Sequence, residues 1–266
     1  TTPLFLPLSS RLIVLLNSLD TQDWDRGTAC GPWTVKDVTA HLLGGNFGRL
    51  WPLRTAGGTA HVAPVYEELL ALINASNEQW VQAARRISPP MLIELLALTD
   101  QRLAERFAAL DPDAQAGASV AWAGESASRN WFDIAREYTE KWLHQQHIRE
   151  AVGQSLLAER ALCQPVFDTF LRGLPHALRH TPADDGAAIV VCIEGEAGDC
   201  WSALRIGTGW QLRAGAVASP AAAVRTPQDR AWRLFTKGIG RNDAAAVIAG
   251  DQALGEACLE LVAIMA

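Results

Sequence analysis

Apolar residues recur three and four positions apart through the first half of the chain, in long segments separated by proline and glycine. This spacing places the apolar side chains on one face of an α-helix. It predicts five helices, over residues 8–19, 35–51, 64–87, 90–110 and 127–152, with a loop over 111–126. Long helices with short connections are typical of an antiparallel bundle. We therefore expect a helical bundle domain over residues 1–154.

The pattern changes after residue 155. One further helix is expected over 157–180, and short strand-like runs follow it. The predicted strands are 187–194, 200–206, 209–213 and 221–225, and two closing helices are predicted at 227–237 and 242–265. A sheet covered by helices makes a small α+β domain, which we place at residues 155–266.

The composition narrows the classes of function. The chain has 266 residues, 49% of them apolar, which is enough for a sizeable core. Its 23 basic and 29 acidic residues give a net charge of −6, so it offers no electrostatic footprint for a nucleic-acid backbone. No uncharged apolar stretch approaches the roughly 18 residues of a membrane span. The first residues given lack the basic and apolar pattern of a secretory leader, so we do not expect one. We expect a cytoplasmic protein that binds neither nucleic acid nor membrane.

The cysteines are odd in number and scattered, without a C-x-x-C pair; they are Cys30, Cys163, Cys192, Cys200 and Cys258. Buried, reduced thiols are the expected state. Cys192 and Cys200 could meet across a hairpin, but a disulfide is unusual in a chain that looks cytosolic. If the reaction needs a thiol, we expect an external molecule rather than a cysteine of the chain to supply it.

Three residues could hold a metal ion. Glu140 and His144 are four residues apart, which places both side chains on one helix face, although such a pair is also typical of a surface ion pair. His41 lies on the apolar side of the helix over 35–51, where an unpaired imidazole would be costly to bury. Helical bundles build metal sites from inward side chains on facing helices. The sequence therefore predicts a site formed by His41, Glu140 and His144.

Two nitrogens and one carboxylate suit zinc, with nickel or iron(II) as alternatives, and three protein ligands leave a position open for water or substrate. His147 and Glu137 flank the pair by one turn each and are alternative ligands or partners that orient the ligands. Gly44 and Gly45 follow His41 by about one turn. Each costs helix stability, so they could leave space for a substrate or mark a kink.

The helix that carries His41 has a clear start signal. Thr34 is the expected N-cap, with Asp37 returning the bond to it and Trp33 packing on Val38. Asp37 could instead orient the imidazole of His41, and these two roles compete.

A family resemblance follows from these segments. The run from Cys30 to Leu42, which reads CGPWTVKDVTAHL, and the later run EKWLH over Glu140–His144 resemble the mycothiol-dependent maleylpyruvate isomerase family. The resemblance implies a DinB-like four-helix metal-binding domain, with the zinc ligands at His41, Glu140 and His144. It extends weakly into the second half, over 234–241 and 249–251. Relatives often have Asp where this chain has His147.

The resemblance also implies a mechanism. A cofactor thiol, mycothiol or another low-molecular-weight thiol, would bind zinc as thiolate and attack an electrophilic small molecule in a transferase or isomerase reaction. A free thiol titrates near about 8.5, whereas a metal-bound thiol is deprotonated outright. A dicarboxylic substrate would be bound well by a guanidinium, which can contact a carboxylate with two hydrogen bonds. Arg241 is the candidate for this contact, and the alternative is that it is an ordinary surface residue.

Two other functions remain open from the sequence. The second half resembles sterol-carrier-type folds, and the ten tryptophans could line a cavity for lipid, although an aromatic core is the simpler explanation. Alternatively, a zinc-bound water, which can ionise near about pH 7, could serve hydrolysis. A homodimer is compatible with the sequence but is not specified by it.

Overall fold

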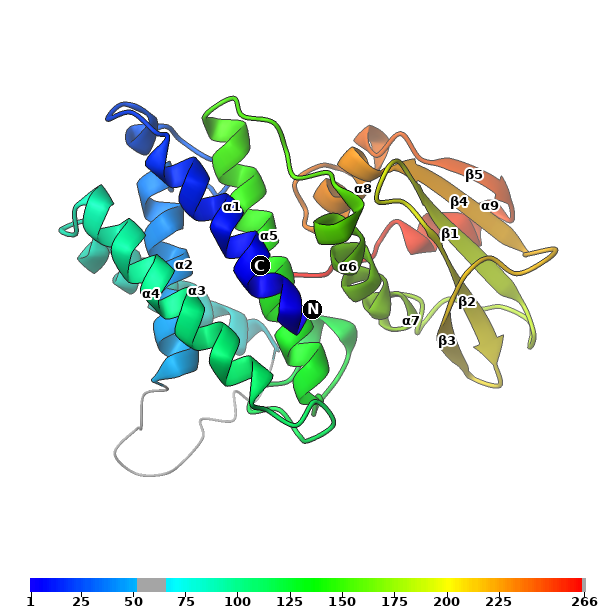
Figure 1. Cartoon of the computed structure of the whole chain (residues 1–266). Coiled ribbons are helices and arrows are strands. Elements are labelled where there is room, and N and C mark those ends of the chain that lie inside the picture. The colour runs from blue at the N-terminus through cyan, green and yellow to red at the C-terminus, as the bar shows by residue number, and fades with distance from the viewer. Residues whose placement is uncertain (52–65, 265–266) are drawn as a thin grey trace. The chain divides into compact units, whose positions relative to one another are not determined.

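A computed structural model describes residues 1–51 and 66–264 (Figure 1). These residues form two compact units, each described here by itself. The first takes in the described residues of 1–114 together with 134–157, and the second consists of 115–133 and 158–264. The domain boundary expected after residue 154 stays a prediction.

The first unit is helical. Its helices are α1 Phe5–Asn17, α2 Val35–Leu50, α3 Tyr66–Ala84, α4 Pro89–Ala108 and α5 Asn130–Ala151, of which α5 begins in the segment that belongs to the second unit. The helices predicted from the apolar spacing are thus confirmed. The expected start of the third helix at residue 64 lies outside the described residues.

The apolar spacing of α4 shows why the bundle forms. Leu92, Leu96 and Leu103 are fully buried, and Phe107 is 5% exposed, so one face of the helix is inside. Phe107 meets Phe5 of α1 edge to face, with ring centroids 5.1 Å apart. Aromatic pairs of this kind add roughly 0.5–1.5 kcal/mol to the energy of burial. The repeat along α4 therefore fixes which face packs inward.

A buried polar network crosses this core. The ammonium of Lys141, on α5, donates to the side-chain oxygen of Asn46 on α2 and to the carboxylate of Asp100 on α4, both over 2.7 Å. Asn46 in turn donates to Thr99 and Asp100 over 2.8 Å, and the Ser9 hydroxyl donates to Asp100 over 2.5 Å. Such groups are buried at low cost only when they are paired and hydrogen-bonded. The network therefore fixes α5 against α1, α2 and α4.

The second unit is a mixed α+β structure. Its helices are α6 Arg160–Phe170, α7 Leu174–Ala177, α8 Gln228–Phe235 and α9 Gln252–Cys258, and its strands are β1 Ala188–Glu194, β2 Cys200–Ile206, β3 Gly209–Ala214, β4 Ala222–Pro227 and β5 Val247–Gly250. The strand order is β3-β2-β1-β4-β5. The β1–β4 pair is parallel and the other neighbours are antiparallel. The predicted bundle followed by an α+β unit is confirmed.

Two predicted helices are wrong in detail. The helix expected over 157–180 ends at Phe170, and a 3-10 turn and the short α7 follow it. The helix expected over 242–265 is replaced by a 3-10 turn, the edge strand β5 and α9, and its expected end at residue 265 lies outside the described residues. Its alanine-rich start favours a helix locally, but pairing with β4 outweighs that preference. Gly250 has φ +82° and ends the strand.

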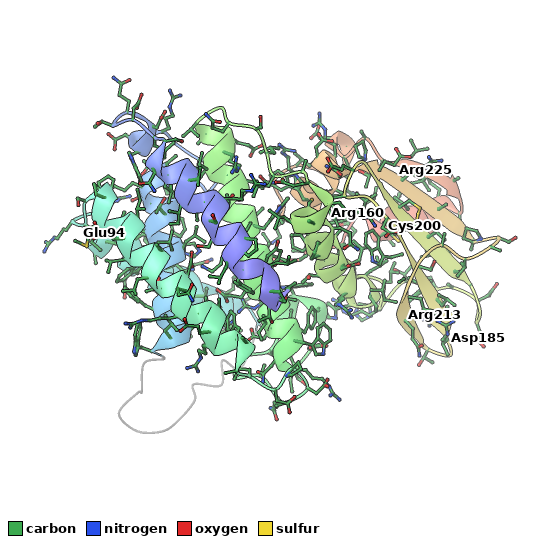
Figure 2. The ribbon with its side chains drawn as sticks, in the orientation of Figure 1. Glu94, Arg160, Asp185, Cys200, Arg213 and Arg225 are labelled. Atoms are coloured by element: carbon green, nitrogen blue, oxygen red, sulfur yellow. A yellow bond between two sulfur atoms is a disulfide. The ribbon has the colours of Figure 1, made fainter. Side chains whose placement is uncertain are left out.

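The expectation that all cysteines are reduced is also wrong. Cys192 and Cys200 are directly opposite in the β1–β2 ladder and form a disulfide (Figure 2, which labels Cys200). The hairpin register brings their Cα atoms to 4.1 Å, so the pairing follows from the strand alignment. Cys163 and Cys258 are buried free thiols, and Cys30 is a half-buried one.

Among the described residues, no helix is both long enough and apolar enough to cross a bilayer.

Candidate metal centre

The first turn of α2 is fixed by a capping box. Thr34 accepts from the backbone N–H of Asp37, and the Asp37 carboxylate accepts from the backbone N–H of Thr34, as predicted. Arg85 makes a two-pronged contact with the same carboxylate, over 2.9 and 3.0 Å. Burial alone would raise the pKa of Asp37, but the hydrogen bonds and charge of Arg85, with those of Thr34, outweigh it and lower the pKa. Asp37 therefore serves the cap, and the competing role of orienting His41 is not seen.

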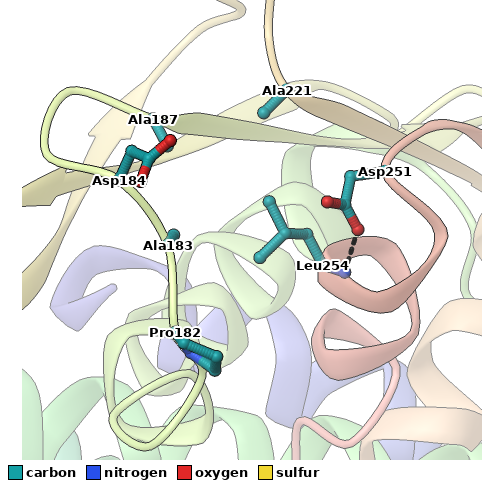
Figure 3. Close-up of a pocket in the computed structure, with 7 residues that line it drawn as sticks. All are labelled: Pro182, Ala183, Asp184, Ala187, Ala221, Asp251 and Leu254. Atoms are coloured by element: carbon teal, nitrogen blue, oxygen red, sulfur yellow. Dashed lines mark hydrogen bonds between the residues drawn. The ribbon is translucent and has the colours of Figure 1, made fainter.

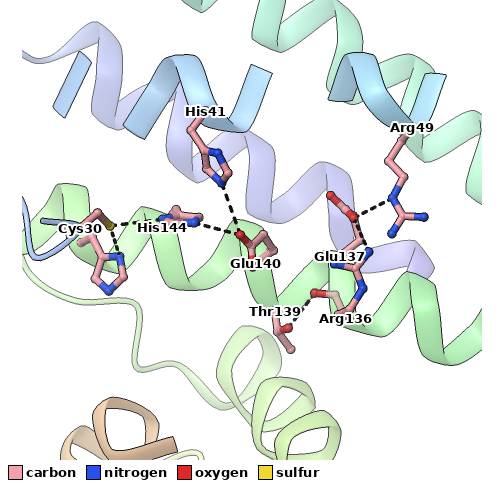
Figure 4. Close-up of polar contacts among 9 residues, drawn as sticks. Cys30, His41, Arg49, Arg136, Glu137, Thr139, Glu140 and His144 are labelled. Carbon is pink, nitrogen blue, oxygen red and sulfur yellow. Dashed lines mark hydrogen bonds and ion pairs between the residues drawn. The ribbon is translucent and has the colours of Figure 1, made fainter. Parts of the chain in front are cut away.

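His41, Glu140 and His144 converge between α2 and α5 (Figure 4). Nε2 of His41 lies 3.4 Å from Oε1 of Glu140, and Nε2 of His144 lies 3.0 Å from the same oxygen. The two imidazole rings are 4.7 Å apart, and one ligand atom of each residue lies within 4.8 Å of the others. Two helices thus bring together the three residues selected from helix-face spacing.

Burial and contacts with neighbouring groups shift the pKa values of Glu140 and His144. Burial would raise the pKa of Glu140, but the hydrogen bond and charge of His144, followed by those of His41, hold that pKa well below its usual range. Burial lowers the pKa of His144. The hydrogen bond and charge of Glu140 oppose this effect, whereas the charges of His41 and Lys141 add to it. A carboxylate beside a neutral imidazole is the state in which both groups can donate electron pairs to a metal ion.

The side chains around His41 hold its ring in place. The Trp33 indole lies with its centroid 5.0 Å from that of His41, and its Nε1 donates to Glu78 over 2.9 Å. A Cβ added at Gly44 would lie 2.4 Å from Cδ1 of Trp80, whose indole donates to the carbonyl of Ala40. Trp80 fills the space at Gly44, so Gly44 does not leave room for a substrate, which was one of the two explanations offered for the glycine pair.

Glu137, one of the two alternative ligands, is engaged elsewhere. Its Oε2 accepts from Nε of Arg49 on α2 over 2.9 Å and from a terminal nitrogen of Arg136 over 3.2 Å (Figure 4). The carboxylate side chain is only 8% exposed. Glu137 therefore ties α5 to α2 one turn away from Glu140.

His147, the other alternative, meets a residue that the sequence did not single out. Its Nδ1 lies 3.0 Å from Sγ of Cys30, and the same sulfur lies 3.6 Å from Nδ1 of His144. Burial raises the pKa of the Cys30 thiol to about 11, with the Thr28 hydrogen bond opposing this effect and the Glu140 charge adding to it. The position of Cys30 at the head of the CGPWT run was the available signal.

Arg241, the predicted substrate contact, lies in the second unit. Its guanidinium is 2.9 Å from the carboxylate of Glu260, and both side chains are more than half exposed, at 52% and 61%. Its part in substrate binding stays a prediction.

The second unit also contains a cavity of about 420 Å³ (Figure 3). Its lining is composed of Pro182, Ala183, Asp184, Ala187, Ala221, Asp251 and Leu254. Asp251 caps α9, since its carboxylate accepts from the backbone N–H of Leu254 over 3.1 Å. Five of these seven residues are apolar, and Asp184 and Asp251 add two carboxylates, so the lining is mixed.

These features define the class of protein: a DinB-like helical bundle joined to an α+β unit with a mixed sheet. Residues 5–149, more than half of the chain, match the family model described as the mycothiol maleylpyruvate isomerase N-terminal domain. The chain belongs to this family, as its motifs predicted. No curated protein sequence matches it.

Two solved structures share the fold. A crystal structure of the mycothiol-dependent maleylpyruvate isomerase superimposes with a TM-score of 0.54 at 11% identity, and one of its histidine-to-alanine mutant with 0.55 at 12%. Each match covers 92% of this chain and 90% of the other. The likeness therefore extends over both units.

Proposed function

We propose that this protein is a metal-dependent enzyme that uses a low-molecular-weight thiol of the mycothiol type to isomerise, or transfer the thiol to, an electrophilic small molecule. His41, Glu140 and His144 hold one divalent ion, with zinc as the first candidate and nickel or iron(II) as alternatives. The observation that carries the proposal is the convergence of these three side chains from α2 and α5. Family membership supports the thiol and the class of reaction.

The residues fit the ion. Two imidazole nitrogens and a carboxylate oxygen form a ligand set that zinc enzymes use, and such a set leaves at least one position open. The Glu140 side chain is 34% exposed, whereas those of His41 and His144 are 12% and 11% exposed. One side of the cluster is therefore reachable from solvent, as a site for an external thiol must be.

The chain's own residues would prepare the site in several ways. His41, Glu140 and His144 would hold the divalent ion, whose contribution would be to lower the pKa of a coordinated thiol. Trp33 restrains the ring of His41 through the contact described above, and the Lys141 network holds α5 so that Glu140 and His144 face α2. Preorganisation of this kind reduces the reorganisation needed when the ligands close on an ion.

Arg241 is proposed as the contact for a substrate carboxylate. Its pairing with Glu260 is exposed, and such pairs are worth only about 0–1 kcal/mol, so a substrate carboxylate could displace it. Arg241→Lys keeps the charge but loses the bidentate contact, and should raise KM more than it lowers kcat. An unchanged KM for both Arg241→Lys and Arg241→Ala would remove Arg241 from the proposal.

The test is an activity assay on the full chain loaded with zinc, using maleylpyruvate and a panel of low-molecular-weight thiols. We expect turnover only when metal and thiol are both present, and loss of turnover in His144→Ala. His180→Ala, which changes an exposed histidine of the second unit, is the matched control and should stay active. Turnover without any thiol would select the hydrolase, and co-purified lipid with function surviving metal removal would select the binding protein.

A further inference from the structure

A second cluster of metal-ligating atoms lies beside the first and includes a thiol. Cys30, His144 and His147 place one ligand atom each within 4.8 Å of one another. The sulfur is 3.0 Å from Nδ1 of His147 and 3.6 Å from Nδ1 of His144. Ligand atoms around a tetrahedral zinc, at bond lengths of about 2.0–2.3 Å, lie roughly 3.3–3.8 Å apart. Of the two sulfur–nitrogen distances, 3.6 Å lies within this range and 3.0 Å lies just below it.

The backbone holds Cys30 at this place. The loop before α2 closes through a bridge between Gly27 and Thr34, and the Thr28 N–H donates to the carbonyl of Trp33 over 3.0 Å. The Thr28 hydroxyl accepts from the N–H of Cys30 over 3.1 Å, and Gly31 turns the chain with φ +62°. Because the capped start of α2 fixes one end of this loop, the thiol is presented toward α5 by the same segment that leads to His41.

His144 connects the two clusters. Its Nε2 faces Glu140, and its Nδ1 faces Cys30. A neutral imidazole has one ring nitrogen with a free electron pair and one that carries the proton. His144 in its neutral form can therefore serve an ion on one side only, and the tautomer decides which side.

We propose that Cys30, His144 and His147 form a second set of metal ligands, which is selective for thiophilic ions. This set shares His144 with the first set, formed by His41, Glu140 and His144. The two sets therefore cannot both hold an ion at the same time. One thiolate and two imidazoles favour soft or borderline ions, whereas a carboxylate in place of the thiolate favours harder ones. When the sulfur–metal bond forms, the Cys30 thiol releases its proton to solvent. The inference does not rest on the proposed activity, because its readout is coordination and not turnover.

The test is a cobalt(II) titration of the full chain in the His41→Ala background, which removes one ligand of the first set. We expect a sulfur-to-cobalt charge-transfer band in the near ultraviolet. Adding Cys30→Ser should abolish the band, whereas adding Cys163→Ser, which changes a buried thiol of the second unit, should leave it intact. Adding His147→Ala should weaken cobalt binding at least about tenfold, since even partners outside the ligand set change affinity by that factor.

Glu140→Gln offers an independent background, which keeps the side-chain size should His41→Ala disturb the fold. The same band is expected there. Absence of the band from both backgrounds, its survival after Cys30→Ser, or unchanged cobalt affinity after His147→Ala would overturn the proposal. None of these outcomes depends on thiol-dependent turnover, so the proposed function is judged separately.

Discussion

Replacing Lys141 by methionine should destabilise the protein strongly, because its ammonium donates to Asn46 and Asp100 in the core of the bundle. Its side chain is 7% exposed and its partner Asp100 is 4% exposed, so the ion pair is buried. The substitution leaves the Asp100 carboxylate with two donors, from Ser9 and Asn46, and leaves the Asn46 oxygen without its lysine donor. Each buried acceptor that loses a donor should cost about 1–3 kcal/mol of the free energy of unfolding. The total for two acceptors agrees with the roughly 3–5 kcal/mol that breaking a buried ion pair costs.

The assay is urea unfolding, followed in parallel by far-ultraviolet circular dichroism and tryptophan fluorescence. With a slope of about 3 kcal/mol per molar urea, the midpoint should fall by roughly 1–1.7 M. Lys36→Met is the matched control, because the Lys36 ammonium makes an exposed bond to the Arg85 carbonyl and its loss should cost at most about 0.5 kcal/mol.

A double variant tests the cause of the loss. Lys141→Met combined with Asp100→Asn removes both charges. The loss in free energy of unfolding of this double variant should be smaller than the sum of the losses of the two single variants by at least about 1 kcal/mol. If Lys141→Met shifted the midpoint no more than Lys36→Met, or if the two changes were additive, the network would not fix α5 as described.

Two further predictions concern α2. Gly44→Ala should destabilise the protein by about 1–3 kcal/mol, because the added Cβ would overlap Trp80. Gly48→Ala should stabilise it by about 0.5–1 kcal/mol, because a Cβ there meets nothing within 4 Å. Thermal unfolding of both variants measures the two effects, and equal shifts would contradict the prediction. The Asp37–Arg85 pair should make stability depend on acid: the folded pKa of Asp37 lies below its unfolded value of about 3.9, so the contribution is complete above that range and is lost as the pH falls through the folded pKa. Asp37→Asn should flatten the fall in stability below about pH 4, and an unchanged slope would refute the assignment.

The parts of the fold that the sequence predicts are those in which local and tertiary preferences agree. The leucines of α4 repeat at helical spacing, and the structure buries them, so both the helix and its inner face could be predicted. The cap at Thr34 depends on residues three positions apart, and it is confirmed. For the same reason, Glu140 and His144 could be placed on one helix face before any packing was known.

The features that were missed depend on contacts distant along the chain. β5 exists because β4 offers it a ladder, which an alanine-rich segment does not reveal. The role of Gly44 depends on Trp80, from a different helix. The Cys192–Cys200 pair is a different case: the two residues are only eight positions apart and a hairpin could be expected to bring them together, but the expected cytosolic setting argued against a disulfide. Cys30 lies 117 residues from His147, so no spacing rule joins them.

The proposed enzyme depends on a divalent metal ion held by His41, Glu140 and His144. The most direct test of this proposal is the metal content of the purified full chain, measured by mass spectrometry after removal of loosely bound ions. We predict one equivalent of a divalent metal, zinc first, in the unmodified chain and in His180→Ala. We predict less than about a tenth of an equivalent in His144→Ala, which removes the imidazole that lies 3.0 Å from the Glu140 carboxylate. A chain without stoichiometric metal, or a His144→Ala variant with unchanged metal content, would show that these three residues do not form a metal site.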